Sequence, residues 1–149
     1  MPSVLDRLID PDSGGTAWRR GYGVQQIVDV VRRDLEDLLN TRQSHQRLPR
    51  EYTEVHNSIV AFGLPDLAAL EAHTPQQREE IGSVIERIIA RFEPRLRNVR
   101  ARMIDAGEKD RRVRFHIDAR LNVDPAPEVS FETVVELITG HASIKASEA

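Results

Sequence analysis

The stretch RFEPRLRNVRAR, residues 91–102, decides the fold, because the spacing of apolar residues changes within it. Before this stretch, apolar residues recur with the period of about 3.6 that is typical of an amphipathic helix, and after it they alternate with arginines. Pro94 cannot continue a helix and disfavours helical geometry at Glu93, so we expect the helix to end here. The sequence therefore predicts a helix followed directly by a half-buried strand.

Helices are predicted upstream of this junction. Residues 24–39 carry an apolar stripe on one face and charged residues on the other, which indicates a helix packed against a core. Thr74 is a candidate N-cap, Pro75 suits the first helical position, and Gln77 follows three residues after the cap, so a second helix should begin there. A shorter helix is predicted within residues 52–62.

Strands are predicted downstream. Apolar and polar residues alternate over residues 99–103, 112–123 and 129–137, and the loop DAGEKD joins the first two segments. Because helices come first and strands follow, we expect an α+β fold in which N-terminal helices pack on a small, mainly antiparallel sheet formed by the C-terminal half. The segment after Gly140 is predicted to be a short tail.

At the start of the first strand, the apolar residues do not follow one continuous alternation. Leu96 is an even-numbered apolar position, whereas Val99 and the apolar residues after it are odd-numbered. Continuous alternation would point Arg95 and Arg97 inward. A bulge or twist near Asn98 would resolve the conflict, so we predict one there.

Length and composition indicate a single soluble domain. The chain has 149 residues, of which 40% are apolar and 30% charged, and these values are ordinary for a globular protein. We expect one domain over residues 24–149, preceded by an apolar arm and glycine-rich linker over residues 1–23. Leu5 and Leu8 on that arm are candidate contacts to a partner protein.

Several classes of chemistry have no support in the sequence. The absence of cysteine excludes disulfides, thiolate zinc sites and thiol catalysis. The five histidines lack metal-ligand spacing, so we expect no metal site and no cofactor. No signal peptide or long apolar run is evident, which favours an intracellular protein without direct membrane insertion.

Two functional alternatives remain at this level. A peptidoglycan hydrolase would use Glu93 as an acid, but the arginines around Glu93 favour its ionised form, which is the wrong form for that role. The Arg-rich hairpin, which includes Arg112 and Arg114, would suit nucleic-acid phosphates. It offers no aromatic platform, however, because Phe115 points inward by parity. We therefore expect no catalytic residue and no nucleic-acid partner.

A family resemblance is carried by five segments in order along the chain. These are LDRLIDP (5–11), RRDLEDLLNTR (32–42), VAFGLPDL (60–67), IIARFEPRLRNVRAR (88–102) and RFHIDARLNVDPAPEVSFETVVEL (114–137). Together they resemble TssE, a family of small baseplate subunits of the bacterial type VI secretion system that is related to the wedge component of contractile phage-tail baseplates. The family's EPRL motif maps onto Glu93, Pro94, Arg95 and Leu96.

The resemblance implies a structural, non-enzymatic role. A TssE-like subunit lies in the cytoplasmic baseplate, docked at the inner membrane, with the wedge proteins TssF and TssG and with TssK as a further candidate partner. Its fold would resemble the strand-exchanging part of the sheath proteins TssB and TssC, and it would offer a sheet edge to the first sheath ring. Glu93 and Arg95 would then pair either with each other or with charges on a partner.

Overall fold

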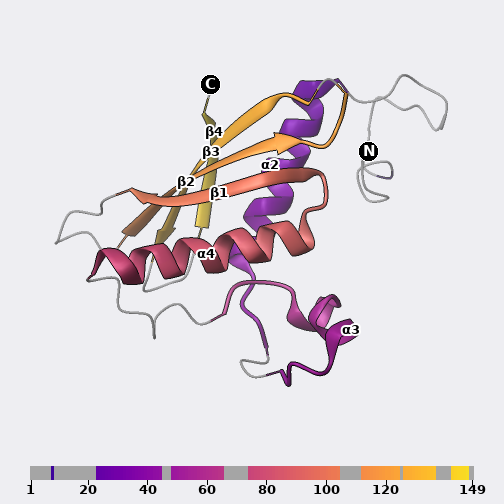
Figure 1. Ribbon diagram of the computed structural model, residues 1–149. Helices are drawn as coiled ribbons and strands as arrows, with labels where there is room; N and C mark the ends of the chain where they lie inside the picture. Colours follow the sequence, from indigo (N-terminus) through magenta and orange to yellow (C-terminus); the bar gives the residue numbers. More distant parts are fainter. Residues whose placement is uncertain are drawn as a thin grey trace.

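The computed structural model of the protein describes Leu8 and residues 23–44, 48–65, 74–104, 112–124, 126–136 and 142–147. Figure 1 shows the elements that these residues form. The helices are α2 (Val24–Asn40), α3 (Thr53–His56), the 3-10 turn η1 (Ile59–Ala61) and α4 (Pro75–Phe92). The strands are β1 (Leu96–Ile104), β2 (Arg112–Leu121), β3 (Glu128–Glu136) and β4 (Ala142–Ser147).

The four strands form one sheet in the order β1-β2-β3-β4, and each strand is antiparallel to its neighbours. The expected α+β architecture is therefore confirmed. Strand β4 lies in the segment that was expected to be a tail, so this part of the expectation is wrong. Its residues Ala142–Ser147 pair with β3, and Ile144 lies opposite Thr133.

One face of the sheet is apolar and carries the core. On β2 the odd-numbered side chains, from Phe115 to Leu121, are buried, whereas Arg114 and Arg120 are exposed. This alternation is the period of 2 that the sequence predicts. The helices must therefore pack on the face with the odd-numbered residues.

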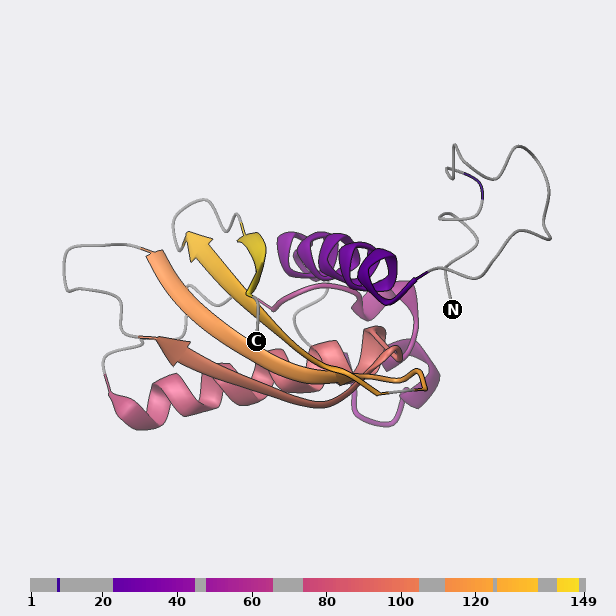
Figure 2. The same ribbon diagram turned by 90° about the horizontal axis from the view of Figure 1, so that it is seen from above.

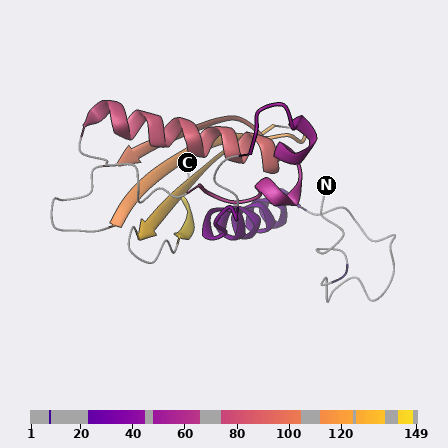
Figure 3. The ribbon, with the colours of Figure 1, turned by 90° about the horizontal axis from the view of Figure 1, so that it is seen from below.

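The two longer helices lie along opposite edges of the sheet. Helix α4 runs beside β1 and α2 beside β4, as the views from above and below show (Figures 2 and 3). Their apolar stripes join the buried side chains of the strands in one core. The buried helical residues of that core are Val31, Leu35, Leu38, Leu39, Ile81, Ile85, Ile88 and Ile89.

The start of α4 follows the predicted capping signal. The Thr74 hydroxyl accepts the N–H of Gln77 at 3.2 Å, and the Gln77 side chain accepts the N–H of Thr74 at 2.9 Å. These two bonds form a capping box and satisfy donors that a helix start leaves open. The predicted start of the helix is thus confirmed.

The segment between α2 and α4 is held to the end of α2 by backbone contacts. The Leu64 N–H donates to the Thr41 carbonyl at 2.7 Å. Gly63 has a φ of 105°, and a Cβ on it would lie 2.4 Å from the Thr41 oxygen. Only glycine fits this close approach. The helix expected within residues 52–62 is shorter than predicted, because α3 and η1 are separate turns.

Most of the expected N-terminal arm lies outside the described residues, and Leu5 is among the residues left out. Leu8 is described, and its side chain is exposed. Within the described parts of the chain, no helix combines the length and apolarity needed to cross a membrane.

Candidate partner-binding site

The chain turns from α4 into β1 at the Glu93–Leu96 corner, which is the EPRL stretch. The Glu93 N–H donates to the Ile89 carbonyl at 2.8 Å and so closes the last turn of the helix. The Leu96 N–H then donates to the Glu93 carbonyl at 3.1 Å. Pro94 follows Glu93 in the chain, and its side chain is exposed. Helix α4 therefore ends where the proline requires.

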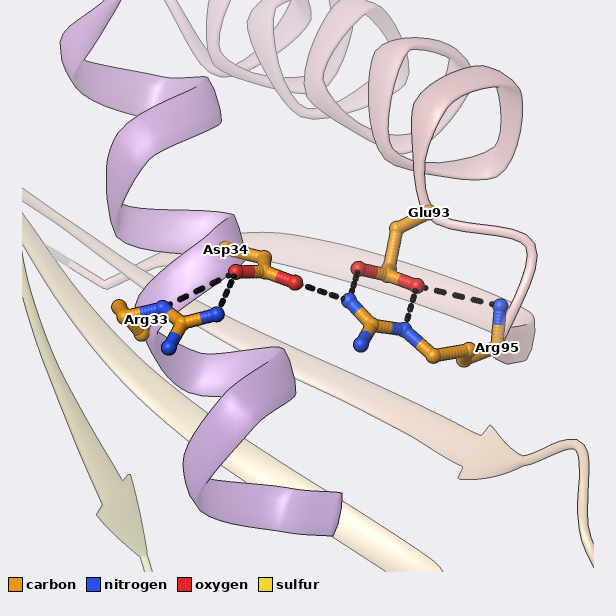
Figure 4. A network of polar contacts seen from close by, with 4 residues as sticks. All are labelled: Arg33, Asp34, Glu93 and Arg95. Atoms are coloured by element: carbon orange, nitrogen blue, oxygen red, sulfur yellow. Dashed lines mark hydrogen bonds and ion pairs between the residues drawn. The ribbon is translucent and has the colours of Figure 1, made fainter. Parts of the chain in front are cut away.

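Glu93 and Arg95 form an ion pair within the chain (Figure 4). The Arg95 Nε donates to Glu93 Oε1 at 2.6 Å, and Arg95 Nη2 donates to Glu93 Oε2. The backbone N–H of Arg95 also donates to Glu93 Oε1, at 3.2 Å. The sequence left open whether Glu93 and Arg95 pair with each other or with a partner. In this structure they form a bidentate pair with each other.

Asp34 on α2 completes the network. Arg95 Nη2 donates to Asp34 Oδ2 at 2.5 Å, and Asp34 Oδ1 accepts Nη2 of Arg33 at 2.8 Å (Figure 4). The hydrogen bonds that Arg95 donates to Glu93 raise the pKa of Arg95 above its ordinary value; burial opposes this shift and Asp34 reinforces it. Arg95 is therefore a permanent cation held between two carboxylates.

A fourth segment, which directly follows β2, also holds the Glu93–Leu96 corner. The Asn122 N–H donates to the Arg95 carbonyl at 2.7 Å. The Asn122 side-chain amide donates to the Pro94 carbonyl at 3.4 Å. Backbone and side chains of this corner are thus both fixed, and its shape is set before any partner arrives.

The predicted bulge follows the corner. The register of β1 against β2 shifts between Arg97 and Arg100, and Asn98 has a φ of 54°. This extra residue allows Leu96 and Val99 both to face the core. The prediction of a bulge near Asn98 is confirmed.

The predicted contact residues differ in their access to a partner. Glu93 and Leu96 are each only 4% exposed, and Arg95 is largely buried, whereas Pro94 and Leu8 are exposed. Beside the corner, α4 and β1 border an open hollow of about 460 Å³, lined by Glu86, Arg87, Ala90, Leu96, Arg97, Asn98, Val99 and Arg100. Pro94 and the rim of this hollow are the exposed parts of the site.

Asp34 and Asn122 belong to the site and were not predicted. Asp34 precedes a core leucine on α2, and Asn122 follows the last residue of β2. Neither carries a local motif that links it to Arg95. An acidic residue beside an apolar stripe is only a weak signal for a buried ion pair, and it does not identify the distant partner.

The chemistry that this site offers is electrostatic and structural. Among the described residues, no group of three or more histidine, aspartate or glutamate side chains is placed to hold a metal ion. Both oxygens of Glu93 accept hydrogen bonds from Arg95, which also separates Glu93 from Asp34. The arrangement joins the end of α4 to α2 through Arg95.

Comparisons with known proteins agree on one structural class. Residues 25–126 match the family model described as "Baseplate wedge protein gp25". One similar solved chain comes from a structure titled "The baseplate complex from the type VI secretion system", with a TM-score of 0.50 and 14% sequence identity. The match covers 84% of this chain and 97% of that chain. No curated protein matches the chain.

Proposed function

Because the chain belongs to the baseplate wedge protein gp25 family, we propose that it is a non-enzymatic structural subunit of a type VI secretion baseplate. In this role it would help to initiate polymerisation of the contractile sheath. The family match spans more than half of the chain and includes α4, the Glu93–Leu96 corner and all but the first residue of α2. The solved baseplate chain supports the same fold over most of the sequence.

The observation that carries a structural role is the Glu93–Arg95–Asp34 network. It joins the end of α4, the start of β1 and the middle of α2 through one guanidinium. We infer that this largely buried ion-pair network holds the three elements in one geometry. This supports a subunit whose function depends on the shape that it presents to its neighbours.

The hydrolase alternative has less support. A glycosidase of the common type needs two carboxyl groups that face a substrate, one of them able to donate a proton. Glu93 is 4% exposed and is held by Arg95 on both oxygens. The nucleic-acid alternative is weakened because several arginines near the hairpin lie beside carboxylates, as Arg120 does with Glu128 at 2.6 Å.

The proposed partners are other proteins of the same machine. We place the subunit with the wedge proteins TssF and TssG, with TssK as a further candidate, in a cytoplasmic baseplate docked at the inner membrane. The sheath proteins TssB and TssC would meet it when the first ring forms. Pro94, Leu5 and Leu8 remain the proposed contact residues, while Glu93, Arg95 and Leu96 would hold the corner in shape.

A co-purification experiment tests this role. The tagged chain is expressed with the wedge and sheath proteins of one secretion system, and the bound proteins are identified. Recovery of wedge proteins, together with loss of fluorescent sheaths in cells that lack the chain, is the expected result. Failure to recover any baseplate or sheath protein, with sheaths still forming normally, would refute the proposal.

A turnover assay distinguishes the structural role from the enzyme alternative. The purified chain and its Glu93→Gln variant are incubated with peptidoglycan, and soluble fragments are measured. We expect no cleavage by either protein. Cleavage by the unsubstituted chain that disappears in Glu93→Gln would instead identify a hydrolase.

A further inference from the structure

The open hollow of about 460 Å³ beside the Glu93–Leu96 corner is lined by residues of α4 and β1, which run side by side (Figure 1). Three of its lining residues are arginines, namely Arg87 on α4 and Arg97 and Arg100 on β1, and the only carboxylate that lines it is Glu86. The whole chain, in contrast, has a formal net charge of −3. The hollow is thus locally basic on a chain that is acidic overall.

The carboxylate of the hollow is already engaged. Glu86 Oε1 accepts the Ala101 N–H at 2.9 Å, and Glu86 Oε2 lies 3.8 Å from Nη1 of Arg100. The side chain of Glu86 is 26% exposed, compared with 72% for Arg100. Glu86 therefore holds the strand and partly neutralises Arg100, and it leaves the charge of the other two arginines uncompensated.

Arg87 and Arg97 have no carboxylate within ion-pair distance among the described residues. Arg87 Nε donates to a backbone oxygen, the Ser83 carbonyl, at 3.2 Å. Arg97 lies opposite Arg120, which is itself paired with Glu128 at 2.6 Å. Like charges directly opposite each other in a sheet are unfavourable. A negative charge brought to the hollow would relieve this repulsion.

The buried part of the hollow is apolar. Leu96 and Val99 line it and are 4% and 9% exposed, and Ala90 is a lining residue on the exposed face of α4. The bulge at Asn98 produces this arrangement, because it lets both apolar strand residues face inward while the arginines beside them stay exposed. An apolar floor with arginines at its rim is the composition that protein interfaces favour.

The charges around the hollow limit what can bind in it. On the outer face of the sheet, Asp118 lies opposite Arg100, and Glu128 lies opposite Arg120 on the strand after that. A nucleic acid carries about one negative charge per 1.7 Å of duplex, and it would extend from the hollow over these carboxylates. A short acidic protein segment can end within the hollow. The charge pattern therefore favours a protein segment over a phosphate backbone.

We propose that the hollow between α4 and β1 binds an acidic segment of another protein in the assembly. Carboxylates of this segment pair with Arg87 and Arg97, and one apolar side chain packs against Leu96 and Val99. Recognition is through side chains, because the bulge at Asn98 interrupts the regular ladder of β1. The inference rests on the proposed function for the source of the occupant, since a baseplate subunit has neighbours that can supply such a segment.

Fluorescence anisotropy with three labelled probes tests the site on the full chain. The first probe is a peptide with one leucine between two pairs of glutamates, the second replaces the glutamates with glutamines, and the third is single-stranded DNA. We expect the acidic peptide to bind and the glutamine peptide not to bind. No binding of the acidic peptide, or equal binding of both peptides, would overturn the inference. Tighter binding of the DNA at the same arginines would overturn the assigned occupant.

Charge reversal compares the hollow with another part of the same sheet. At physiological salt, where the Debye length is about 8 Å, only nearby charges affect the peptide strongly. Arg97→Glu should weaken peptide binding roughly tenfold, because it replaces an attractive charge by a repulsive one. The matched control is Arg114→Glu, at an exposed position of β2 outside the hollow, and it should change the affinity little. Equal losses would show that overall charge, and not the hollow, attracts the peptide.

Filling the hollow tests its shape without a change of charge. Ala90→Trp places a large side chain in the lining and should prevent peptide binding. Ser83→Trp, at an exposed position of α4 outside the lining, is the matched control and should bind as the unsubstituted chain does. Circular dichroism confirms that each variant is folded. Full binding by folded Ala90→Trp would contradict the inference.

Co-purification separates failure of this inference from failure of the proposed function. When the wedge and sheath proteins are expressed together with the chain, Arg97→Glu should lose a protein that the unsubstituted chain and Arg114→Glu both recover. If Arg97→Glu still recovers every partner, the assignment of the hollow fails and the baseplate role stands. If the unsubstituted chain recovers no partner, the proposed function fails, and the peptide measurements alone decide whether the hollow binds acidic segments.

Discussion

Arg95 donates to Asp34, which lies 61 positions earlier in the chain, and so fixes the start of β1 to the middle of α2. The same guanidinium is bound by Glu93 at the end of α4. One side chain therefore joins the two longer helices and the first strand. The strength of this junction can be measured independently of any partner.

Substitution of Arg95 by methionine should strongly destabilise the protein. It leaves the Glu93 carboxylate buried without its partner, and removal of one member of a buried pair costs about 3–5 kcal/mol. The double variant Glu93→Gln/Arg95→Met should lose less, because no charge is left buried. Urea unfolding of the single and double variants gives both free energies. If Arg95→Met alone were as stable as the unsubstituted chain, the network would not stabilise the fold.

Asn98 should tolerate glycine and resist valine. Its φ of 54° lies in the left-handed region, which costs a residue with a Cβ about 1–2 kcal/mol and is worst for β-branched side chains. We expect the melting temperature of Asn98→Gly to be close to that of the unsubstituted chain, and that of Asn98→Val to be lower. Thermal melts followed by circular dichroism compare them. Equal melting of the two variants would argue against the bulge.

Alanine at Gly82 should destabilise the protein, although alanine usually stabilises an exposed helix by about 1 kcal/mol over glycine. The added Cβ would lie 2.7 Å from the Ala101 carbonyl oxygen, so α4 and β1 would have to separate. Ser83→Ala, at an exposed neighbouring position of the same helix, is the matched control and should change little. A Gly82→Ala protein that melts higher than the control would show that α4 does not contact the strand this closely.

Valine at Thr133 should stabilise the protein by about 1 kcal/mol. Thr133 is 1% exposed, and among the described residues its hydroxyl oxygen is buried with no hydrogen-bond partner. Valine keeps the shape and removes the unsatisfied group. Thr133→Ser, which keeps the hydroxyl and loses a methyl, should be less stable than the unsubstituted chain. Chemical denaturation gives the free energy of unfolding of all three proteins. A destabilised Thr133→Val would indicate that the hydroxyl has a hydrogen-bond partner.

The sequence predicts the elements whose signals are local. The capping box at Thr74, the helix end before Pro94 and the bulge at Asn98 each depend on residues within a few positions of one another. Such signals act through local backbone geometry. All three predictions are confirmed.

The features that were missed depend on distant partners. Strand β4 is short and contains only one large apolar residue, Ile144, so its alternation is too weak to distinguish it from a tail. Its pairing with β3 supplies the hydrogen bonds that define it. Asp34 meets Arg95 only because α2 and the Glu93–Leu96 corner are brought together by the core, and no spacing in the sequence encodes that contact.

The position of α2 beside β4 has a consequence for synthesis on the ribosome. Glu36 and Ile144 are 108 positions apart, so α2 is translated long before the strand against which it packs. In contrast, α4, β1, β2 and β3 follow one another closely and each contacts the next. Because chains emerge from the N-terminus first, the apolar stripe that includes Leu35 must wait, partly uncovered, while most of the protein is made. We expect this helix to be the segment that a nascent-chain chaperone binds.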